Sequence, residues 1–477
     1  MNKRLLAYVI AVFSLFVSPA VLLADSQVIS ANARIGLDLT VYGNALALIR
    51  DRRNLLETNS SGQLTFEAIS PQSIGTSFRI SGPDGLQVIE KSFIPASLSL
   101  STLLESSIGK KVGIRMRKRP GTTENGIKYG TLLATNGGAL VQTSRGIETV
   151  KPARLVFDRL PEKLTPVARF HARTRGQYTS PAQVTLSYLS SGISWRSDYS
   201  LVIDPDFTAG KLESWATIQN STGVAFENTH LKLVAGTVNT RERARPQPKV
   251  MMSAARLSMD AASEVVVSAR ESLGNFHLYT IKTPVDLASG QTVQLPLIPM
   301  SRVALKRTLI SRGTIHFYGR QNAVPQAQSH PTIELLMVNR QPSGPGKPMA
   351  AGLVRLFTQD SSGTEQFAGE DRINDVPVGG TVKLTTGQAF DLTVERVRTA
   401  YSRNNQPRNA FEETWQISVI NGSNTAQQVL IAEPFPGEWE IREETVPHQK
   451  TNGEARWQLS VPAKGKAMLS YKVRVRR

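Results

Sequence analysis

Apolar and polar side chains alternate at every second position along much of this chain, and sustained helical periodicity is nearly absent. The clearest case lies near the C-terminus, over residues 469–475. The odd-numbered positions there are apolar (Leu469, Tyr471, Val473 and Val475), and the even-numbered positions are polar (Ser470, Lys472 and Arg474). Successive side chains of a strand point to opposite faces, so such a segment buries one side. Many short segments of this kind, separated by Gly, Asn and Pro turns, predict a mainly β chain. We expect several antiparallel, immunoglobulin-like β-sandwich domains and few short helices.

A length of 477 residues favours several domains. Behind a leader over residues 1–24 we expect an N-terminal β region (25–100), a short helix with a small barrel of the SH3 or Sm type (101–176), a β-sandwich (177–297) and a C-terminal β-sandwich region (298–477). The first region should open with a strand over 37–49. The helix should have Ser101 as its N-cap and Gly109 as its C-terminal cap, since glycine adopts the left-handed conformation without strain.

Short alternating segments predict the strands of the small barrel, over residues 112–116, 129–134, 139–142 and 147–150. Gly-rich and Asn-rich hairpin turns separate the last three. The alternation then lapses between residues 241 and 274, where Arg and Pro give way to Met, Ala and Ser. We expect a long loop there, with one short helix near 258–270. Loops on rigid β domains commonly carry function, so this loop is a candidate partner contact.

The N-terminus has the pattern of an export signal. Lys3 and Arg4 precede an apolar run over 5–17 that is too short to span a membrane, and small residues follow it. We expect cleavage after Ala24, with Ala20 as the alternative, and a periplasmic or secreted mature protein with no transmembrane span. Export makes nucleic acid an irrelevant partner.

Cysteine is absent, so the exported chain has no disulfide and no thiol nucleophile. The formal charge is +18, or +16 without Lys3 and Arg4. No phosphate loop, dinucleotide motif, nucleophile elbow or paired-His zinc motif is present. The pattern Ser107-x-x-Lys110 matches a hydrolase motif whose partner motifs are missing. We therefore assign no catalytic residue, cofactor or metal, although Asp204 with Asp206, or Glu370 with Asp371 and Asp375, would suit Ca²⁺ if the fold assembled them.

Basic residues fall at every second position in two segments that we expect to be strands. They are Arg169, His171, Arg173 and Arg175 in the first and Arg115, Arg117 and Arg119 in the second. An extended segment presents such residues on one face. Near an anionic membrane each basic residue is worth on the order of 1 kcal/mol. The two stripes are candidate anionic-surface binding sites, and solvated strand faces are the alternative interpretation.

Several motifs in the second half of the chain resemble a family of bacterial proteins. They read SYLSSGISWRSDY over 187–199, ATIQNSTG over 216–223, LKLVAG over 231–236, GLVRLF over 352–357, FAGED over 367–371 and GQAFDL over 387–392. Together they resemble the domain of unknown function that forms the C-terminal part of mucoidy-inhibitor proteins, over about residues 180–477. The resemblance implies a link to capsule or exopolysaccharide phenotypes.

The residues of these motifs favour a structural interpretation. Trp195 and Tyr199 flank Ser197 on one strand face, which suits a sandwich core. Turns are expected at Asn220–Gly223 and at Gly369–Asp371. The motif positions that we interpret as scaffold are Trp195, Asp198, Tyr199, Asn220, Gly223, Gly369, Glu370 and Asp371.

We therefore expect an exported, non-catalytic binding or scaffold protein of the cell envelope. Its partner would be an envelope protein, a glycan or an anionic lipid surface. The alternative is a hydrolase acting on envelope glycan or exopolysaccharide, with carboxylates converging from Asp198, Glu370, Asp371 or Asp391. Such an enzyme needs two carboxylates about 5 to 10 Å apart.

Overall fold

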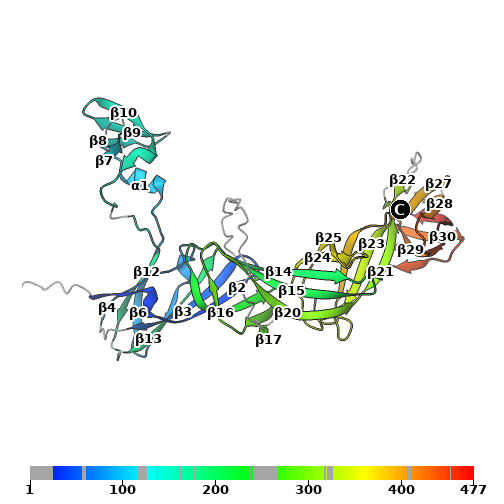
Figure 1. The fold of residues 1–477 in the computed structure, drawn as a ribbon, viewed down its shortest axis with the longest axis horizontal. Coiled ribbons are helices and arrows are strands. Elements are labelled where there is room, and N and C mark those ends of the chain that lie inside the picture. Colours follow the sequence, from blue (N-terminus) through cyan, green and yellow to red (C-terminus); the bar gives the residue numbers. More distant parts are fainter. Residues whose placement is uncertain are drawn as a thin grey trace, which may run out of the picture. The chain divides into compact units, whose positions relative to one another are not determined.

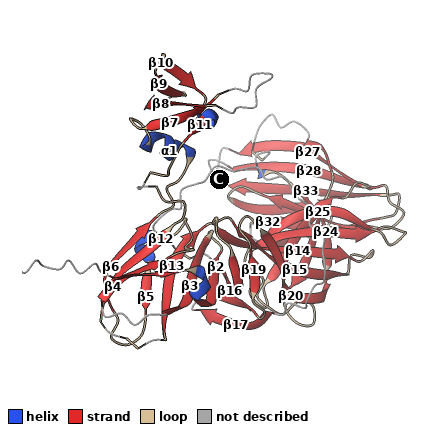
Figure 2. Ribbon diagram, turned by 60° about the vertical axis from the view of Figure 1, so that its left-hand side comes forward, coloured by secondary structure: helices blue, strands red, loops and turns tan. Residues whose placement is uncertain are grey.

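The computed structural model describes most of the chain outside the expected leader. The described residues are 25–55, 61–116, 126–136, 138–161, 164–176, 178–179, 181–236, 238–239, 267–273, 276–315, 318–319, 326–404, 410–451 and 453–476. Strands make up most of them, as Figure 2 shows, so the expected mainly β class is confirmed. The expected leader, and residues 241–266 of the expected loop, lie outside this part. No helix in the described residues is long and apolar enough to cross a membrane.

The chain divides into two compact units, one of residues 1–36 and 50–188 and the other of residues 37–49 and 189–477. Three strands contain a boundary between the units: β2 (Arg34–Tyr42), β3 (Leu46–Leu55) and β13 (Ala182–Ser191). The single strand expected over 37–49 is wrong, because a turn at Gly43–Ala45 divides it into β2 and β3. Ala45 has a φ of 58°, a left-handed conformation that pattern analysis assigns to Gly or Asn rather than Ala.

The first unit contains a four-stranded sheet in the order β1-β4-β12-β6, with bounds Asp25–Ile29, Ser61–Phe66, Arg169–Arg175 and Gln87–Ile94. Strands β1 and β4 are parallel, and β12 is antiparallel to both of its neighbours. The short strand β5 (Arg79–Ser81) pairs with β13. Short 3₁₀ turns lie at Ala31–Ala33, Gly75–Ser77 and Pro152–Arg154.

The same unit contains a five-stranded sheet in the order β10-β9-β8-β7-β11, with bounds Gly146–Val150, Ala139–Thr143, Ile127–Ala134, Lys111–Arg115 and Leu155–Val156. Its four longer strands match the predicted segments to within two residues. The expected barrel is wrong for the described residues, because the sheet has two unpaired edges, β10 and β11. We call strands β7–β11 the small sheet (Figure 1).

Helix α1 (Leu100–Ser106) packs on the small sheet, with Leu104 in a core that also contains Val112 and Leu132. The expected N-cap Ser101 is wrong by two positions. Ser99 caps the helix instead, because its side chain accepts from the Thr102 amide while the Thr102 hydroxyl accepts from the Ser99 amide. Gly109 has a φ of 79°, the left-handed conformation expected of it, just beyond the helix.

The second unit begins with two sheets. One is part of an eight-stranded sheet and contains β17 (Val267–Leu273), β18 (Phe276–Ile281), β16 (Phe226–Ala235) and β2 in that order, and β19 (Val285–Leu287) also pairs with β16. The other, which we call the central sheet, has the order β20-β15-β14-β24-β25, with bounds Thr292–Ala304, Ala209–Asn220, Ile193–Ile203, Gly352–Gln359 and Glu365–Ile373. The helix expected over 258–270 is wrong from Val267 onward, where β17 begins.

The C-terminal part is a sandwich of two sheets that share one core. One sheet has the order β26-β23-β21-β29-β32-β31 (Thr381–Gln388, Thr332–Val338, Lys306–Arg312, Gln427–Pro434, Glu454–Val461, Gln449–Thr451). The other has the order β22-β27-β28-β33-β30 (Gln326–Ser329, Leu392–Asn404, Ala410–Asn421, Lys466–Arg476, Glu438–Glu444). Trp457 from the first sheet and Trp415 from the second belong to the same buried cluster. The predicted inward residues Leu469, Tyr471, Val473 and Val475 are all buried.

Two buried asparagines fix the loops that follow β15 and β28 in the same way. The Asn220 side chain donates to the carbonyl of Val224 and accepts from the amide of Thr222. Asn421 donates to the carbonyl of Thr425 and accepts from the amide of Ser423. In each case the side-chain amide of the asparagine donates to a carbonyl four residues later in the chain. The side chain therefore closes the loop that leads to the next strand.

We expect Asn421→Ala to destabilise the C-terminal sandwich by about 1–3 kcal/mol, because it leaves buried backbone groups without partners. Urea unfolding followed by tryptophan fluorescence measures the loss. Asn424→Ala, an exposed change in the same loop, is the matched control and should have little effect. Equal stability of the two variants would show that the loop does not depend on the Asn421 bonds.

Candidate functional site

Strand β14 directs three motif residues into the protein. Trp195, Ser197 and Tyr199 are 7%, 0% and 1% exposed, in agreement with the predicted shared face. The Trp195 Nε1 donates to the Val234 carbonyl over 3.1 Å, and the Tyr199 hydroxyl donates to the Ala350 carbonyl over 2.8 Å. Burial raises the pKa of Tyr199 well above its usual 10, so the hydroxyl stays protonated. These contacts are with the scaffold.

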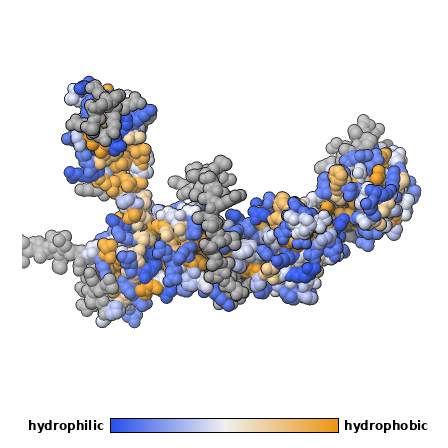
Figure 3. All heavy atoms as spheres, viewed as in Figure 1, coloured by the Kyte–Doolittle hydropathy of each residue, from blue (hydrophilic) through white to orange (hydrophobic). Residues whose placement is uncertain are grey.

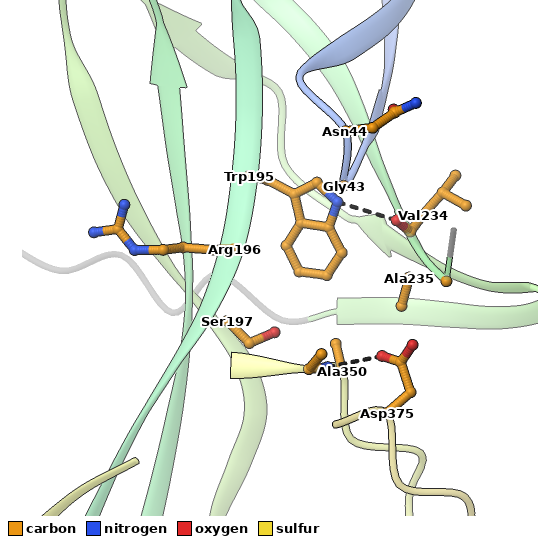
Figure 4. A pocket seen from close by; sticks show the side chains of 11 residues that line it. Gly43, Asn44, Trp195, Arg196, Ser197, Val234, Ala235, Ala350 and Asp375 are labelled. Atoms are coloured by element: carbon orange, nitrogen blue, oxygen red, sulfur yellow. Dashed lines mark hydrogen bonds between the residues drawn. The ribbon is translucent and has the colours of Figure 1, made fainter. Parts of the chain in front are cut away.

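A hollow of about 280 Å³ lies beside Trp195. Figure 4 shows the indole directed toward Val234, and the Arg196 side chain leaving the opposite side of β14. Asp375 also lines this hollow, and its Oδ1 accepts from the Ala351 amide over 2.7 Å. Small residues, among them Gly43 and Ala235, form much of the remaining wall, so the hollow presents no set of reactive groups.

The other face of β14 carries a buried carboxylate. Asp198 is 4% exposed, and its Oδ2 accepts from the Thr217 hydroxyl over 2.5 Å and pairs with Arg196 Nε at 3.2 Å. Its Oδ1 is buried and accepts no hydrogen bond within the described residues; the Arg355 Nη1 is 3.6 Å away. A buried acceptor without a hydrogen bond costs about 1–3 kcal/mol. Such a group is suited to receive a donor from a ligand.

A second hollow, of about 560 Å³, opens over Asp198. Its lining residues come from β14, β24 and β25 and from the turns beside them: Arg196, Ser197, Asp198, Ala351, Gly352, Leu353, Arg355, Arg372, Ile373 and Asn374. The charged residues in this lining are three arginines and one aspartate. The arrangement is suited to hold an anion, and it contains no second carboxylate for acid–base chemistry.

The predicted basic stripe over 169–175 lies on β12, with Phe170 and Ala172 buried on the other face as expected. Ion pairs offset part of its charge, because Arg169 pairs with Glu67 at 3.0 Å and Arg173 with Glu90 at 2.6 Å. Burial, together with the neighbouring Arg169 charge, lowers the pKa of His171, which favours its neutral form. Of the three arginines, only Arg175 has no ion pair within the described residues. The stripe therefore presents less positive charge than its sequence indicates.

The second predicted stripe is described only at Arg115, because Arg117 and Arg119 lie outside the described residues. Arg115 is exposed on β7, opposite Ile127 of β8. The face around it is also apolar: Ile147 is 62% exposed, Ile127 45% and Tyr129 43%. Figure 3 shows hydrophobic atoms at the surface of the part that carries α1 and the small sheet. Sequence reasoning identified the arginines here and missed the apolar residues, since exposed and buried strand residues look alike in a short sheet.

The remaining motif residues support backbone geometry. Asn220 and Gly223 shape the loop after β15, as expected, and Gly223 has a φ of 91°. The turn expected at Gly369–Asp371 is wrong, because these residues lie inside β25 beside a bulge. A Cβ on Gly369, whose φ is 141°, would lie 2.5 Å from the Thr386 carbonyl oxygen. Asp371 accepts from the Thr385 amide, and the Glu370 side chain lies on the exposed face.

The candidate catalytic carboxylates do not form a pair around the hollow. Of Asp198, Glu370, Asp371 and Asp391, only Asp198 lines it. In the part of the chain that the structure describes, no three His, Asp or Glu side chains come together as a metal site. Two of the suggested Ca²⁺ ligands have partners in the protein. Asp204 forms an ion pair with Arg302, and Asp375 accepts a hydrogen bond from the Ala351 backbone amide.

The fold and the hollow define a class of protein: a cysteine-free, mainly β chain with a charged hollow over Asp198 that is lined by three arginines. Residues 184–477 match the model of the domain of unknown function DUF4139. The chain therefore belongs to the DUF4139 family, as the motifs from residue 187 onward predicted. No curated protein matches the chain.

Proposed function

We propose that the chain is an exported, non-catalytic binding protein of the cell envelope, periplasmic or secreted, that attaches to an anionic lipid surface. The observation that carries this proposal is the outward face of the small sheet, which combines exposed apolar and basic side chains. Lys111 lies with its Nζ 4.4 Å from the centre of the Tyr129 ring, and Arg115 lies opposite Ile127. Strand alternation places Tyr129 and Ile127 on the same side of β8.

Both kinds of side chain act in the same direction at such a surface. Each basic residue contributes on the order of 1 kcal/mol near an anionic leaflet. Each buried apolar side chain adds the transfer free energy of its area, about 25 cal/mol per Å². The formal charge, +18 for the full chain and +16 without Lys3 and Arg4 of the expected leader, favours the approach at long range.

Cosedimentation of the full chain with phosphatidylglycerol vesicles tests the proposal. We expect Lys111→Gln with Arg115→Gln to weaken the partition by about 30-fold, the equivalent of roughly 2 kcal/mol. Ile127→Ser with Ile147→Ser should also weaken it, and should do so at high salt as well as at low salt. The matched control is Ile89→Ser, which changes an isoleucine that is 49% exposed on β6 of the other sheet.

Two outcomes would contradict attachment through the small sheet. One is retention of the double variants on the vesicles at the level of the control. The other is a larger loss on replacing Arg169, Arg173 and Arg175 together by Ala, which would assign the contact to β12. Binding to phosphatidylcholine as strong as to phosphatidylglycerol would remove the electrostatic part of the argument.

Export and the link to mucoidy-inhibitor proteins belong to the same proposal. A leader that ends at Ala24 would deliver the basic chain to the compartment where anionic lipid and exopolysaccharide lie. Cell fractionation, combined with mass spectrometry of the N-terminal peptide, tests export and cleavage after Ala24. Protein that stays inside the cell with its leader intact would contradict them. The alternative of a glycan hydrolase receives no support from the hollow, because Asp198 has no facing carboxylate there.

A further inference from the structure

The hollow over Asp198 combines two features that point to one kind of ligand. On the outward face of the central sheet, Asp198 of β14 lies in register with Leu353 of β24, and Leu353 with Arg372 of β25. Arg355 follows two residues after Leu353, so alternation places its side chain on the same face. Arg196 is on that face of β14 for the same reason. The positive groups therefore surround a single carboxylate over an apolar floor at Leu353.

The arginines have room to meet a ligand. The side chains of Arg196 and Arg355 are 62% and 44% exposed, and Arg372 is exposed as well. The lining has a formal charge of +2, because Asp198 is its single acidic residue. Two further carboxylates lie on this face, Glu370 of β25 opposite Arg355 and Glu213 of β15 opposite Ser200, and neither lines the hollow. Planar guanidinium groups bind carboxylates in two-point contacts, so the charge suits a carboxylate ligand.

Asp198 adds a second requirement. Its Oδ2 is occupied by Thr217 and Arg196, whereas its buried Oδ1 accepts no hydrogen bond within the described residues and has a long ion pair with Arg355, at 3.6 Å. A ligand that supplied a hydroxyl donor would satisfy this oxygen. The same ligand would place its anionic group against Arg355 and Arg372.

We propose that this hollow binds a hydroxylated carboxylate, that is, an acid whose carboxylate has a hydroxyl group nearby. Its carboxylate contacts the arginines, its hydroxyl donates to Asp198 Oδ1, and its carbon skeleton lies on Leu353. The volume of about 560 Å³ is within the usual range of small-ligand pockets. The site lies on a different sheet from the surface proposed for lipid attachment, so the two proposals stand or fall separately.

Titration calorimetry of the full chain with galacturonate tests the site, with galactose and propionate as the two half-probes. Galactose keeps the hydroxyls without the carboxylate, and propionate keeps the carboxylate without the hydroxyls. We expect galacturonate to bind at least tenfold more tightly than either. Arg355→Gln and Arg372→Gln should each weaken it by about tenfold to a hundredfold. Arg302→Gln, a change at an exposed arginine of β20 that pairs with Asp204, should leave the affinity unchanged.

Asp198→Asn separates the two features of the ligand. It should reduce the preference for galacturonate over propionate while propionate still binds. Titration with polygalacturonate shows whether the natural ligand is a polymer or a free acid. If the chain binds polygalacturonate, per sugar residue, more tightly than galacturonate, the ligand is a polymer. Equal or weaker binding indicates a free hydroxy acid. The proposal is overturned if galacturonate shows no saturable binding, if galactose binds equally well, or if the Arg355 and Arg372 variants match Arg302→Gln. Vesicle attachment by these variants reports on the lipid proposal alone.

Discussion

Replacing Glu433 with alanine is expected to destabilise the C-terminal sandwich by about 3–5 kcal/mol, the usual cost of removing one partner of a buried ion pair. Glu433 is 1% exposed and Arg396 is 2% exposed. Arg396 Nε donates to Glu433 Oε1 over 2.8 Å. Without the carboxylate, the guanidinium would keep its contact with the Ser311 carbonyl and lose its counter-charge inside the core.

The same carboxylate also organises two tyrosines. The Tyr318 hydroxyl donates to Glu433 Oε2 over 2.7 Å and lies 2.9 Å from the Tyr471 hydroxyl. Burial, and then the Glu433 charge, raise the pKa of both tyrosines well above 10, so the hydroxyls stay protonated. Losing Glu433 therefore leaves a phenol as well as a guanidinium without its acceptor.

Urea unfolding of the full chain, followed through the fluorescence of Trp415 and Trp457 in this core, measures the effect. Glu443→Ala, at a side chain that is 75% exposed on β30, is the control and should change little. The double variant Arg396→Met with Glu433→Leu should recover much of the stability, because it removes both charges together. A Glu433→Ala variant as stable as the control would show that the pair is not needed.

Local features of the fold could be predicted because they depend on neighbours in the chain. The alternation over 469–475 identified the buried face of β33 correctly, and the strands of the small sheet followed from their Gly-rich turns. The helix after residue 98 was also predicted, but not its first residue. Ser99 and Ser101 are both suitable N-caps, and only the reciprocal bonds with Thr102 distinguish them.

Backbone irregularities were the features that sequence patterns missed. Ala45 turns the chain between β2 and β3 in a conformation for which its side chain gives no signal. Gly369 looked like a turn residue, whereas a close contact with the Thr386 carbonyl requires glycine inside a strand. In both cases the reason lies in a constraint that local composition does not record.

The candidate site could not be predicted because its parts are distant in the chain. Asp198, Arg355 and Arg372 meet only because β14 pairs in parallel with β24, and β24 pairs with β25. Parallel pairing needs a long connection, so no short motif announces it. The motif around Trp195 was recognised, but which of its residues face outward toward other charges depends on that pairing.

Asp51 is the second buried charge on which a large effect depends. Asp51 and Arg53 are both 0% exposed, and Arg53 Nη2 donates to Asp51 Oδ2 over 2.6 Å. Arg34 contacts both carboxylate oxygens, at 3.0 and 2.9 Å. Burial alone would raise the pKa of Asp51, but the hydrogen bonds and charges of Arg34 and Arg53 outweigh it and hold that pKa below its usual value.

This shift gives the stability of the first unit a definite pH dependence. Because the folded-state pKa of Asp51 lies below the unfolded value of about 3.9, the stabilisation is complete above that value and is lost as the pH falls through the folded-state pKa. We expect Asp51→Asn to cost about 3–5 kcal/mol near neutral pH, since Arg53 then lacks its buried counter-charge. The difference between the wild type and the variant should shrink in acid, where Asp51 is itself neutral.

Urea unfolding monitored by circular dichroism at a series of pH values measures this difference. Asp84→Asn, which changes an exposed aspartate of the same unit, should show no such dependence. A difference that stayed constant from neutral pH into acid would mean that the amide disturbs packing rather than charge. In that case protonation of Asp51 would cost no stability. The contacts that hold Arg34 of β2 and Arg53 of β3 in place would then depend on the shape of the side chains and not on the charge of Asp51.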